Sequence, residues 1–261
     1  MIKYSPKSQP NWNELIKDYS AAGQQHALDR RPNLWVFGYI PEGEILSNYV
    51  SSNAKLLDFG CGNGRMARYL RYRIGCEVVG VDINPEAIAR AQAFKDGNHY
   101  LVIKENEIPD SIAPFDGCLS NHVFPTYSSR NEIVKSLQAI RRCLNSGSPL
   151  IIYVDNTNYT GIRYTTFIGG IPGQKYTSGE PWPMKIYLGE TQVMDFHDYF
   201  WTPEDYLEAI RLAGYTDATV TFPTYNVEYQ RKYEEYFGFQ LSEEFEKEKA
   251  FPPAAIYSAK A

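Results

Sequence analysis

The sequence is poor in the residues that mark several classes of protein. It contains only 4 cysteines among its 261 residues, and Cys61, Cys76, Cys118 and Cys143 are widely spaced. No Cys-x-x-Cys pair occurs, which excludes the zinc and redox sites built on that motif. We expect all four cysteines to be reduced and structural.

A basic surface and a long apolar run are also missing. The formal net charge is −5, and lysine and arginine form no long cluster, so electrostatic capture of nucleic acid is unsupported. No apolar run approaches the roughly 20 residues that cross a bilayer, and residues 1–7 are polar. We therefore expect a soluble, cytoplasmic protein without nucleic-acid or membrane partners, and nothing indicates its oligomeric state.

What the chain does have is enough apolar material for a large core. Hydrophobic residues make up 43% of the sequence, and strand patterns alternate with helix patterns from about residue 54 onward, which is typical of one α/β domain. We expect a single domain over residues 1–261. Within it we expect a helical cap over residues 1–52, an insertion over 157–200 and a helical insertion over 225–250.

The most informative stretch is residues 55–65, Lys-Leu-Leu-Asp-Phe-Gly-Cys-Gly-Asn-Gly-Arg. Its apolar run predicts a buried strand, and Asn63 suits the N-cap of the helical pattern that follows. Between them, Gly60, Gly62 and Gly64 allow a tight turn whose backbone can approach a ligand, because no Cβ stands in the way. The stretch therefore predicts a cofactor loop.

The spacing of the glycines indicates which cofactor. A dinucleotide-binding G-x-G-x-x-G pattern would need its third glycine at Arg65. The sequence instead reads Asp58-x-Gly60-x-Gly62-x-Gly64, which resembles motif I of the class I S-adenosylmethionine-dependent methyltransferases. The resemblance extends from about residue 54 to 261 and implies S-adenosylmethionine as cofactor.

A second acid follows in the same context. Residues 77–82 predict the next strand, and Asn84, Pro85 and Glu86 are the N-cap, first residue and first-turn acid of a helix. In the family, the acid at the end of this strand, here Asp82, binds the ribose hydroxyls. The resemblance implies that eight residues bind the cofactor: Asp58, Gly60, Gly62, Gly64, Asp82, Ile83, Asn106 and Asn121.

Residues 99–103 predict a third strand, whose continuous apolar run is typical of a buried parallel strand. The family usually places an acid or amide after it, against the adenine amine. Glu105 and Asn106 are the two candidates, and the residues alone do not separate them from a solvated charged turn.

Residues 115–122 resemble the fourth strand of the family, whose carboxyl end faces the transferable methyl group. Asn121 and His122 then lie at the reaction centre. A histidine there can hold or deprotonate an acceptor, since its ordinary pKa is about 6.5. The alternative for His122 is a helix-start histidine bonded to backbone.

A helix over residues 133–144 and a fifth strand over 149–154 come next, and the strand ends at Asp155 and Asn156. This pair resembles the acid-amide ligands of magnesium-dependent catechol O-methyltransferases. Those enzymes also have an acid where this chain has Asn121, so the ligand set is incomplete and we predict no metal.

The insertion after the fifth strand predicts an aromatic lid over the acceptor, with a hairpin at residues 185–195. His197 is the second histidine candidate, and Tyr164, Tyr187 and Tyr199 are candidate acceptor contacts. From the cap, Tyr19 or His26 is placed near the acceptor by the family's architecture, although simple packing also explains Tyr19. The insertion's aromatic residues are Tyr159, Tyr164, Phe167, Tyr176, Trp182, Tyr187, Phe196 and Tyr199.

A helix that starts at Thr202, a sixth strand over 218–222 and a seventh over 254–258 complete the pattern. The fold class is therefore α/β, a doubly wound seven-stranded sheet that is mostly parallel, with the seventh strand antiparallel.

The predicted function is methyl transfer to a small-molecule or short-peptide secondary metabolite. We expect O-methylation, with a carboxylate ahead of a phenol, because a carboxylate arrives ionised whereas a phenol of pKa about 10 needs a base or a metal. A small-molecule N-methyltransferase is the main alternative. An NAD-dependent oxidoreductase and a non-catalytic S-adenosylmethionine-binding protein are the alternatives from other classes.

Overall fold

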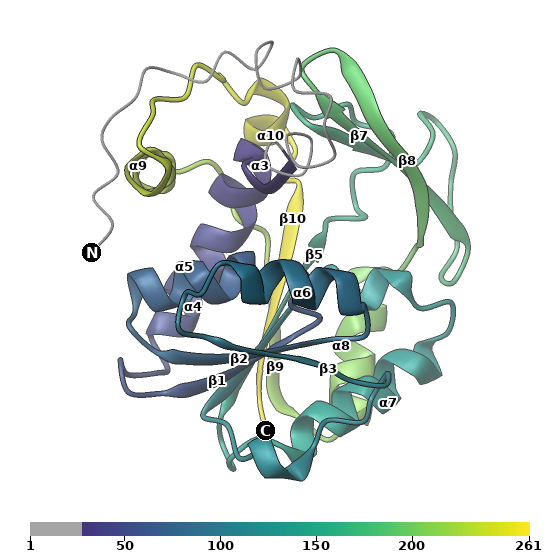
Figure 1. The fold of residues 1–261 in the computed structure, drawn as a ribbon. Helices are drawn as coiled ribbons and strands as arrows, with labels where there is room; N and C mark the ends of the chain where they lie inside the picture. The colour runs from purple at the N-terminus through teal and green to yellow at the C-terminus, as the bar shows by residue number, and fades with distance from the viewer. Residues whose placement is uncertain (1–27) are drawn as a thin grey trace.

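The computed structural model describes residues 28–261, and its centre is a seven-stranded sheet with the order β3-β2-β1-β4-β5-β10-β9 (Figure 1). The strands are β1 (Lys55–Phe59), β2 (Glu77–Asp82), β3 (His99–Val102), β4 (Gly117–Asn121), β5 (Pro149–Asp155), β9 (Thr216–Thr221) and β10 (Ala254–Lys260). Neighbours from β3 to β5 pair in parallel, whereas β10 is antiparallel to both β5 and β9. The predicted fold class is confirmed.

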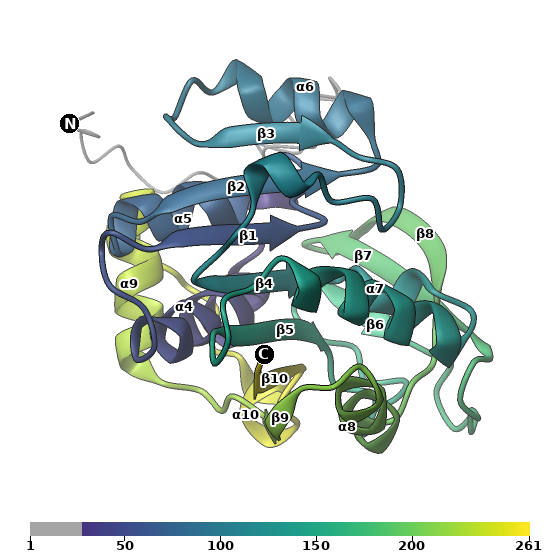
Figure 2. The same ribbon diagram turned by 90° about the horizontal axis from the view of Figure 1, so that it is seen from below.

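Helices cover both faces of this sheet (Figure 2). Alternate residues of β1 point to opposite faces, so Leu56 joins one hydrophobic cluster and Leu57 the other. The helices are α4 (Ile40–Ser47), α5 (Arg65–Arg73) and α6 (Pro85–Ala93) on the face of Leu56, and α7 (Arg130–Arg142) and α8 (Pro203–Leu212) on the face of Leu57. The sheet is thus doubly wound, and its carboxyl edge is left free for a ligand.

Two predicted helix starts are confirmed by their caps, and one is wrong. The Asn84 side chain accepts hydrogen bonds from the backbone of α6, and Thr202 forms a capping box with Asp205 at α8. At α5, however, the N-cap is Gly64 at φ 75°, with no side-chain cap. The amide of Asn63 is used elsewhere, since its Nδ2 donates to the Asp29 carboxylate at 2.7 Å.

The third strand is shorter and less buried than predicted. It lies at the edge of the sheet and pairs only with β2. Its Tyr100 is buried, but Leu101 and Val102 are 36% and 51% exposed. A parallel strand is covered on both faces only where helices or loops lie over both, and here α6 packs against β3 while the outer side faces solvent.

The insertion after β5 forms a small antiparallel sheet of β6 (Phe167–Gly169), β7 (Pro181–Leu188) and β8 (Thr191–Tyr199). The hairpin predicted at 185–195 is confirmed and is longer than expected. In Figure 1 the strands β7 and β8 of this sheet stand above β5, at the upper right. It therefore lies on the ligand side of the main sheet.

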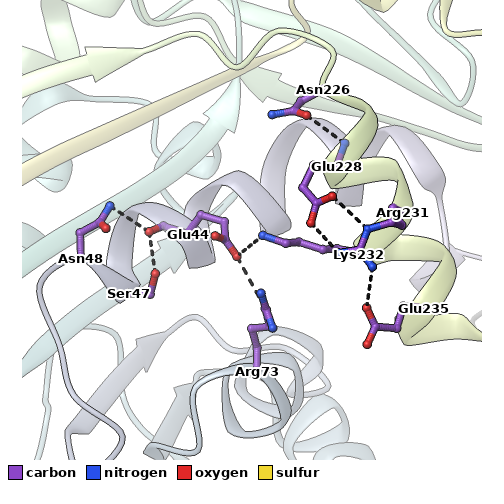
Figure 3. A network of polar contacts seen from close by, with 9 residues as sticks. All are labelled: Glu44, Ser47, Asn48, Arg73, Asn226, Glu228, Arg231, Lys232 and Glu235. Carbon is purple, nitrogen blue, oxygen red and sulfur yellow. Dashed lines mark hydrogen bonds and ion pairs between the residues drawn. The ribbon is translucent and has the colours of Figure 1, made fainter.

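The second insertion contributes α9 (Val227–Phe237) and α10 (Glu246–Ala250). Helix α9 packs on α4, and Figure 3 shows the ion pairs at this contact: Lys232 Nζ lies 2.8 Å and Arg73 Nε 3.6 Å from the Glu44 carboxylate. Tyr233 is fully buried and its hydroxyl donates to the carbonyl of Arg30. The insertion thus braces the cap.

In the cap, the described residues form α3 (Pro32–Leu34), a π-helical segment η1 (Trp35–Tyr39) and α4, which starts at Ile40. Short 3₁₀ segments η2 (Asp110–Ile112) and η3 (Phe124–Thr126) complete the elements. The part of the predicted cap that spans residues 1–27, with Tyr19 and His26, lies outside the described residues. Among residues 28–261 no helix is both long and apolar enough to span a membrane.

Candidate functional site

A cavity of about 500 Å³ lies at the carboxyl edge of the main sheet. Its walls come from the loop after β1, the ends of β4 and β5, the cap and the small sheet. Because these segments are far apart in sequence, the cavity depends on the whole fold. Residues that line it include Arg31, Asp58, Gly60, Gly62, Asn121, His122, Asp155, Phe167, Phe196, His197 and Asp198.

The glycine loop after β1 forms the floor of one end. Gly60 has φ 76°, and a Cβ there would lie 2.0 Å from Val123 Cγ2, so no other residue fits without a shift. Gly62 has φ 54°, and a Cβ there would meet no atom within 4 Å, so its backbone faces open space. The loop is tied to β2, because the N–H groups of Gly60 and Cys61 donate to the Val81 carbonyl at 2.8 and 3.0 Å.

Asp82 at the end of β2 connects this loop to the next helix. Its Oδ2 accepts the N–H of Gly62 at 2.8 Å and its Oδ1 accepts the N–H of Asn84 at 2.8 Å. Each carboxylate oxygen keeps a second acceptor direction. Asp82 therefore fixes the loop and retains the capacity to accept hydroxyl groups.

Three buried polar side chains lie between the glycine loop and the cap. Asp58 is 1% exposed and Glu42, from α4, is 0% exposed, and Asn121 from β4 lies beside them. Burial, followed by repulsion from Asp82, raises the pKa of Asp58 to about 7. Burial, followed by repulsion from Asp58, raises the pKa of Glu42 well above its ordinary value.

The other end of the cavity carries two acids and a histidine. Asp155 Oδ2 at the end of β5 lies 3.6 Å from Nδ1 of His122. Burial, and then the neighbouring Asp198, raise the pKa of Asp155 to about 7, and burial raises that of Asp198 to about 6. Burial, with Arg31 and Arg65 nearby, lowers the pKa of His122 to about 3, so its imidazole is neutral at pH 7.

His122 is held firmly in this position. Its backbone is left-handed, with φ 55°, and its N–H donates to the Tyr153 carbonyl at 2.9 Å. Its ring meets the ring of Tyr153 edge-on at 4.5 Å. Its Nε2 is buried and has no hydrogen-bond partner among residues 28–261. A neutral imidazole with an open nitrogen can accept a hydrogen bond from a ligand, whereas the lowered pKa makes it a weak base.

Comparison with known proteins identifies the family. A family model described as a methyltransferase domain matches residues 57–152. N-demethylindolmycin N-methyltransferase of Streptomyces griseus is 30% identical over 182 residues, which span 67% of this chain and 75% of that protein. The chain is a class I S-adenosylmethionine-dependent methyltransferase.

Two further relatives show how widely this methyltransferase fold is shared. A malonyl-[acyl-carrier protein] O-methyltransferase of Enterobacter lignolyticus is 34% identical over 89 residues, which span 34% of this chain and 35% of that protein. The solved structure of CalS10, an amino pentose methyltransferase from Micromonospora echinaspora, matches with a TM-score of 0.60 at 14% identity. That match covers 93% of this chain and 98% of CalS10, and it supports the fold alone.

The methyltransferase structure brings only part of the expected cofactor set to the cavity wall. Asp58, Gly60, Gly62 and Asn121 line the cavity. The other four expected residues do not: Gly64 caps α5, Asp82 bonds the loop, Ile83 is 63% exposed and Asn106 has a buried side-chain oxygen away from the lining.

Of the expected acceptor residues, His122 and His197 line the methyltransferase cavity. Three tyrosines, Tyr164, Tyr187 and Tyr199, do not line it. Tyr164 stacks on Phe167 in the core of the small sheet, the Tyr187 ring lies under the Arg163 guanidinium, and Tyr199 packs at the rim of the main core. Tyr19 lies outside the described residues.

The acid-amide pair after β5 divides between two places. Asp155 faces the cavity, whereas the Asn156 amide donates to the Pro252 carbonyl at 2.9 Å and its oxygen accepts the N–H of Asn158. Within residues 28–261 no group of three or more His, Cys, Asp or Glu is arranged to hold a metal ion.

The sequence reasoning missed four charged residues of the cavity: Arg31, Arg65, Arg90 and Asp198. None of them belongs to a motif. The contacts between the cap and the cofactor loop, an ion pair of Asp29 with Arg65 at 2.7 Å and a hydrogen bond from Asn63 to Asp29 at 2.7 Å, appear only in the fold. Asp198 directly follows the candidate His197, but strand alternation predicts that two consecutive residues point to opposite faces, so the pattern offers no reason to choose it.

Proposed function

We propose that this enzyme transfers a methyl group from S-adenosylmethionine to the nitrogen of a small-molecule amine. The observation that carries the proposal is the pair Asp155 and Asp198 at the acceptor end, beside neutral His122. Two carboxylates on one wall attract a cation and repel an anion, and in a partly buried cavity this selection is strong. The N-methyltransferase among the relatives supports the same choice.

In this proposal the residues bind the ammonium form of the acceptor and remove its proton. S-adenosylmethionine, when bound, supplies an activated methyl group that a neutral amine can attack without covalent help from the protein. The Asp155 carboxylate takes the proton from the amine, directly or through His122 Nε2, and its pKa of about 7 suits that task at neutral pH. The apolar side chains of Phe167, Met184 and Phe196 cover the cavity and limit water.

The small sheet supports the expected role of residues 157–200 as a lid. Phe167, Met184, Ile186 and Phe196 reach the cavity from its three strands. We propose that the described cap, the sheet and both insertions form one catalytic unit, and that the lid carries acceptor specificity.

A carboxylate acceptor, which the sequence analysis favoured, remains the second candidate because of Arg31. Its guanidinium lines the cavity beside Asp155 and His122. A buried guanidinium is a strong partner for a carboxylate. The two acids on the same wall oppose an anion, so we rank the amine first.

The test uses methyl-labelled S-adenosylmethionine and an extract of the source organism. An N-methyl product keeps its label in mild base and binds a cation exchanger at acidic pH. A methyl ester releases labelled methanol in mild base, and that result would replace the amine by a carboxylate. Asp155→Asn should lose about 100-fold or more in rate, while Asp195→Asn, on the outer side of the lid, serves as the matched control.

A further inference from the structure

The buried group of Glu42, Asp58 and Asn121 is short of hydrogen-bond donors. Among residues 28–261, no close hydrogen bond reaches either carboxylate oxygen of Glu42, Oδ2 of Asp58 or either side-chain atom of Asn121, and only a weak hydrogen bond from the Asn121 side chain acts on Glu42. Buried polar atoms are rarely left unpaired, and several acceptors in one place favour a proton that turns one of them into a donor. These five atoms comprise four acceptors and one donor.

The ligand group that fits is a cation with several N–H donors. Asp58 and Asn121 line the cavity beside the glycine loop, whereas Glu42 lies behind them and does not. The positive charge of an ammonium group bound beside Asp58 would offset the charge of that carboxylate. The methionyl end of the cofactor carries such an ammonium group.

We propose that Glu42 is a positioning residue for the cofactor's ammonium group. In its protonated form it donates a hydrogen bond to the Asp58 carboxylate or the Asn121 oxygen, and so holds the two side chains that face the ligand. Glu42 comes from α4, outside residues 57–152 that match the methyltransferase model, so the glycine motif does not predict it. The proposal rests on the cofactor and is independent of the acceptor.

The surroundings of Glu42 support a protonated acid. Burial and then repulsion from Asp58 raise the pKa of Glu42, and these outweigh a hydrogen bond from the Asn121 side chain, which lowers it. The other titratable groups whose pKa is raised by Glu42 are Tyr39, Cys118 and Tyr153, and no cation is among the causes of the raised pKa of Glu42. A glutamate that is fully buried without a cationic partner keeps its proton. Its hydroxyl then adds one donor to a group that lacks them.

The experiment measures, by calorimetry, the binding of three ligands to the full chain. S-adenosylhomocysteine has both the amine and the carboxylate, its deaminated analogue keeps only the carboxylate, and 5′-methylthioadenosine has neither. Glu42→Leu should lower the affinity for S-adenosylhomocysteine by about tenfold or more. Its affinity for the other two ligands should change by less than about threefold. Glu42→Gln should stay within about threefold for all ligands, because its amide N–H replaces the donor. Glu44→Gln on the same helix is the control, since Glu44 faces Lys232 and Arg73 at the surface.

Three results would overturn the proposal. Equal losses for all three ligands would show that Glu42 only supports the fold, and unchanged binding by Glu42→Leu would show that it has no role. If Glu42→Gln bound S-adenosylhomocysteine as weakly as Glu42→Leu, the role of Glu42 as a protonated hydrogen-bond donor would be excluded. If neither leucine nor glutamine is tolerated, the unmutated protein still decides: a deaminated analogue that binds as tightly as S-adenosylhomocysteine excludes an ammonium subsite.

Discussion

Replacing Asp155 by asparagine should stabilise the protein at alkaline pH while removing its activity. Asp155 lines the cavity at the proposed acceptor end, its side chain is only 12% exposed, and burial raises its pKa from 3.8 to about 7. Ionised Asp155 is therefore held in an environment that disfavours its charge. An amide of the same shape carries no charge and does not bear that cost.

The size and sign follow from the two pKa values. Each tenfold change in proton affinity is worth about 1.4 kcal/mol, so full ionisation of Asp155 costs the folded state about 4 kcal/mol. The folded protein binds this proton more tightly than the unfolded chain. Stability from this group is therefore present below pH 4 and falls as the pH rises to about 7. At pH 5 less than half of the cost applies.

The assay is the free energy of unfolding of Asp155→Asn and of the parent, measured at pH 5 and pH 8. We expect the variant to gain about 2 to 3 kcal/mol more at pH 8 than at pH 5, which corresponds to a Tm difference of several degrees. Asp195→Asn, whose side chain is 57% exposed, should show no such dependence. If the free energy of unfolding of Asp155→Asn exceeded that of the parent by the same amount at both pH values, the reasoning would be refuted. That result would mean that ionised Asp155 does not destabilise the folded state.

Three further predictions concern the loop, the histidine and the lid. Gly60→Ala should weaken S-adenosylhomocysteine by about tenfold or more because its Cβ collides with Val123, whereas Gly147→Ala, at φ 78° with no neighbour within 4 Å, should leave ligand affinity unchanged in the same calorimetry. In His122→Asn, the asparagine can adopt the φ of 55° at this position. The free energy of unfolding of the parent should fall as the pH falls from about 6.5 towards 3, and unfolding curves should show a smaller fall in the variant. Phe196→Ala should raise the acceptor KM and leave S-adenosylhomocysteine affinity within about threefold; a reverse pattern in kinetics and calorimetry would contradict the lid.

The main sheet was predictable because its signals are local. Leu56 and Leu57 mark a buried strand, the glycines mark the turn and Asn84 marks the start of α6, and each signal lies within the element that it marks or next to it. Whether a strand lies at the edge of the sheet depends on contacts between distant parts of the chain, so local patterns do not predict it. The apolar run of β3 resembles that of a central strand, and only its single pairing with β2 exposes Leu101 and Val102.

The cap of α5 shows a second limit of local reasoning. Asn63 and Gly64 are both acceptable near a helix start, and asparagine is the stronger N-cap in isolation. The close approach of Tyr100, whose ring would lie 2.6 Å from a Cβ at position 64, requires glycine there with a left-handed backbone. Asn63 is then free to bond Asp29 of the cap. A contact from a distant strand therefore overrode the capping preference.

The choice between an anionic and a cationic acceptor depends on charges that only the fold brings together. From the sequence, His122 and His197 were the polar residues near the acceptor, and the tyrosines around them suited an already ionised carboxylate. The folded cavity brings Asp155 of β5 and Asp198 of β8 together, with Arg31 of the cap beside Asp155. The energy of a buried charge depends strongly on the charges near it. The effect of residues 31, 155 and 198 on a bound acceptor is therefore determined by how the fold places them together. The pair of carboxylates Asp155 and Asp198 is therefore the reason why we propose an amine, rather than a carboxylate, as the acceptor.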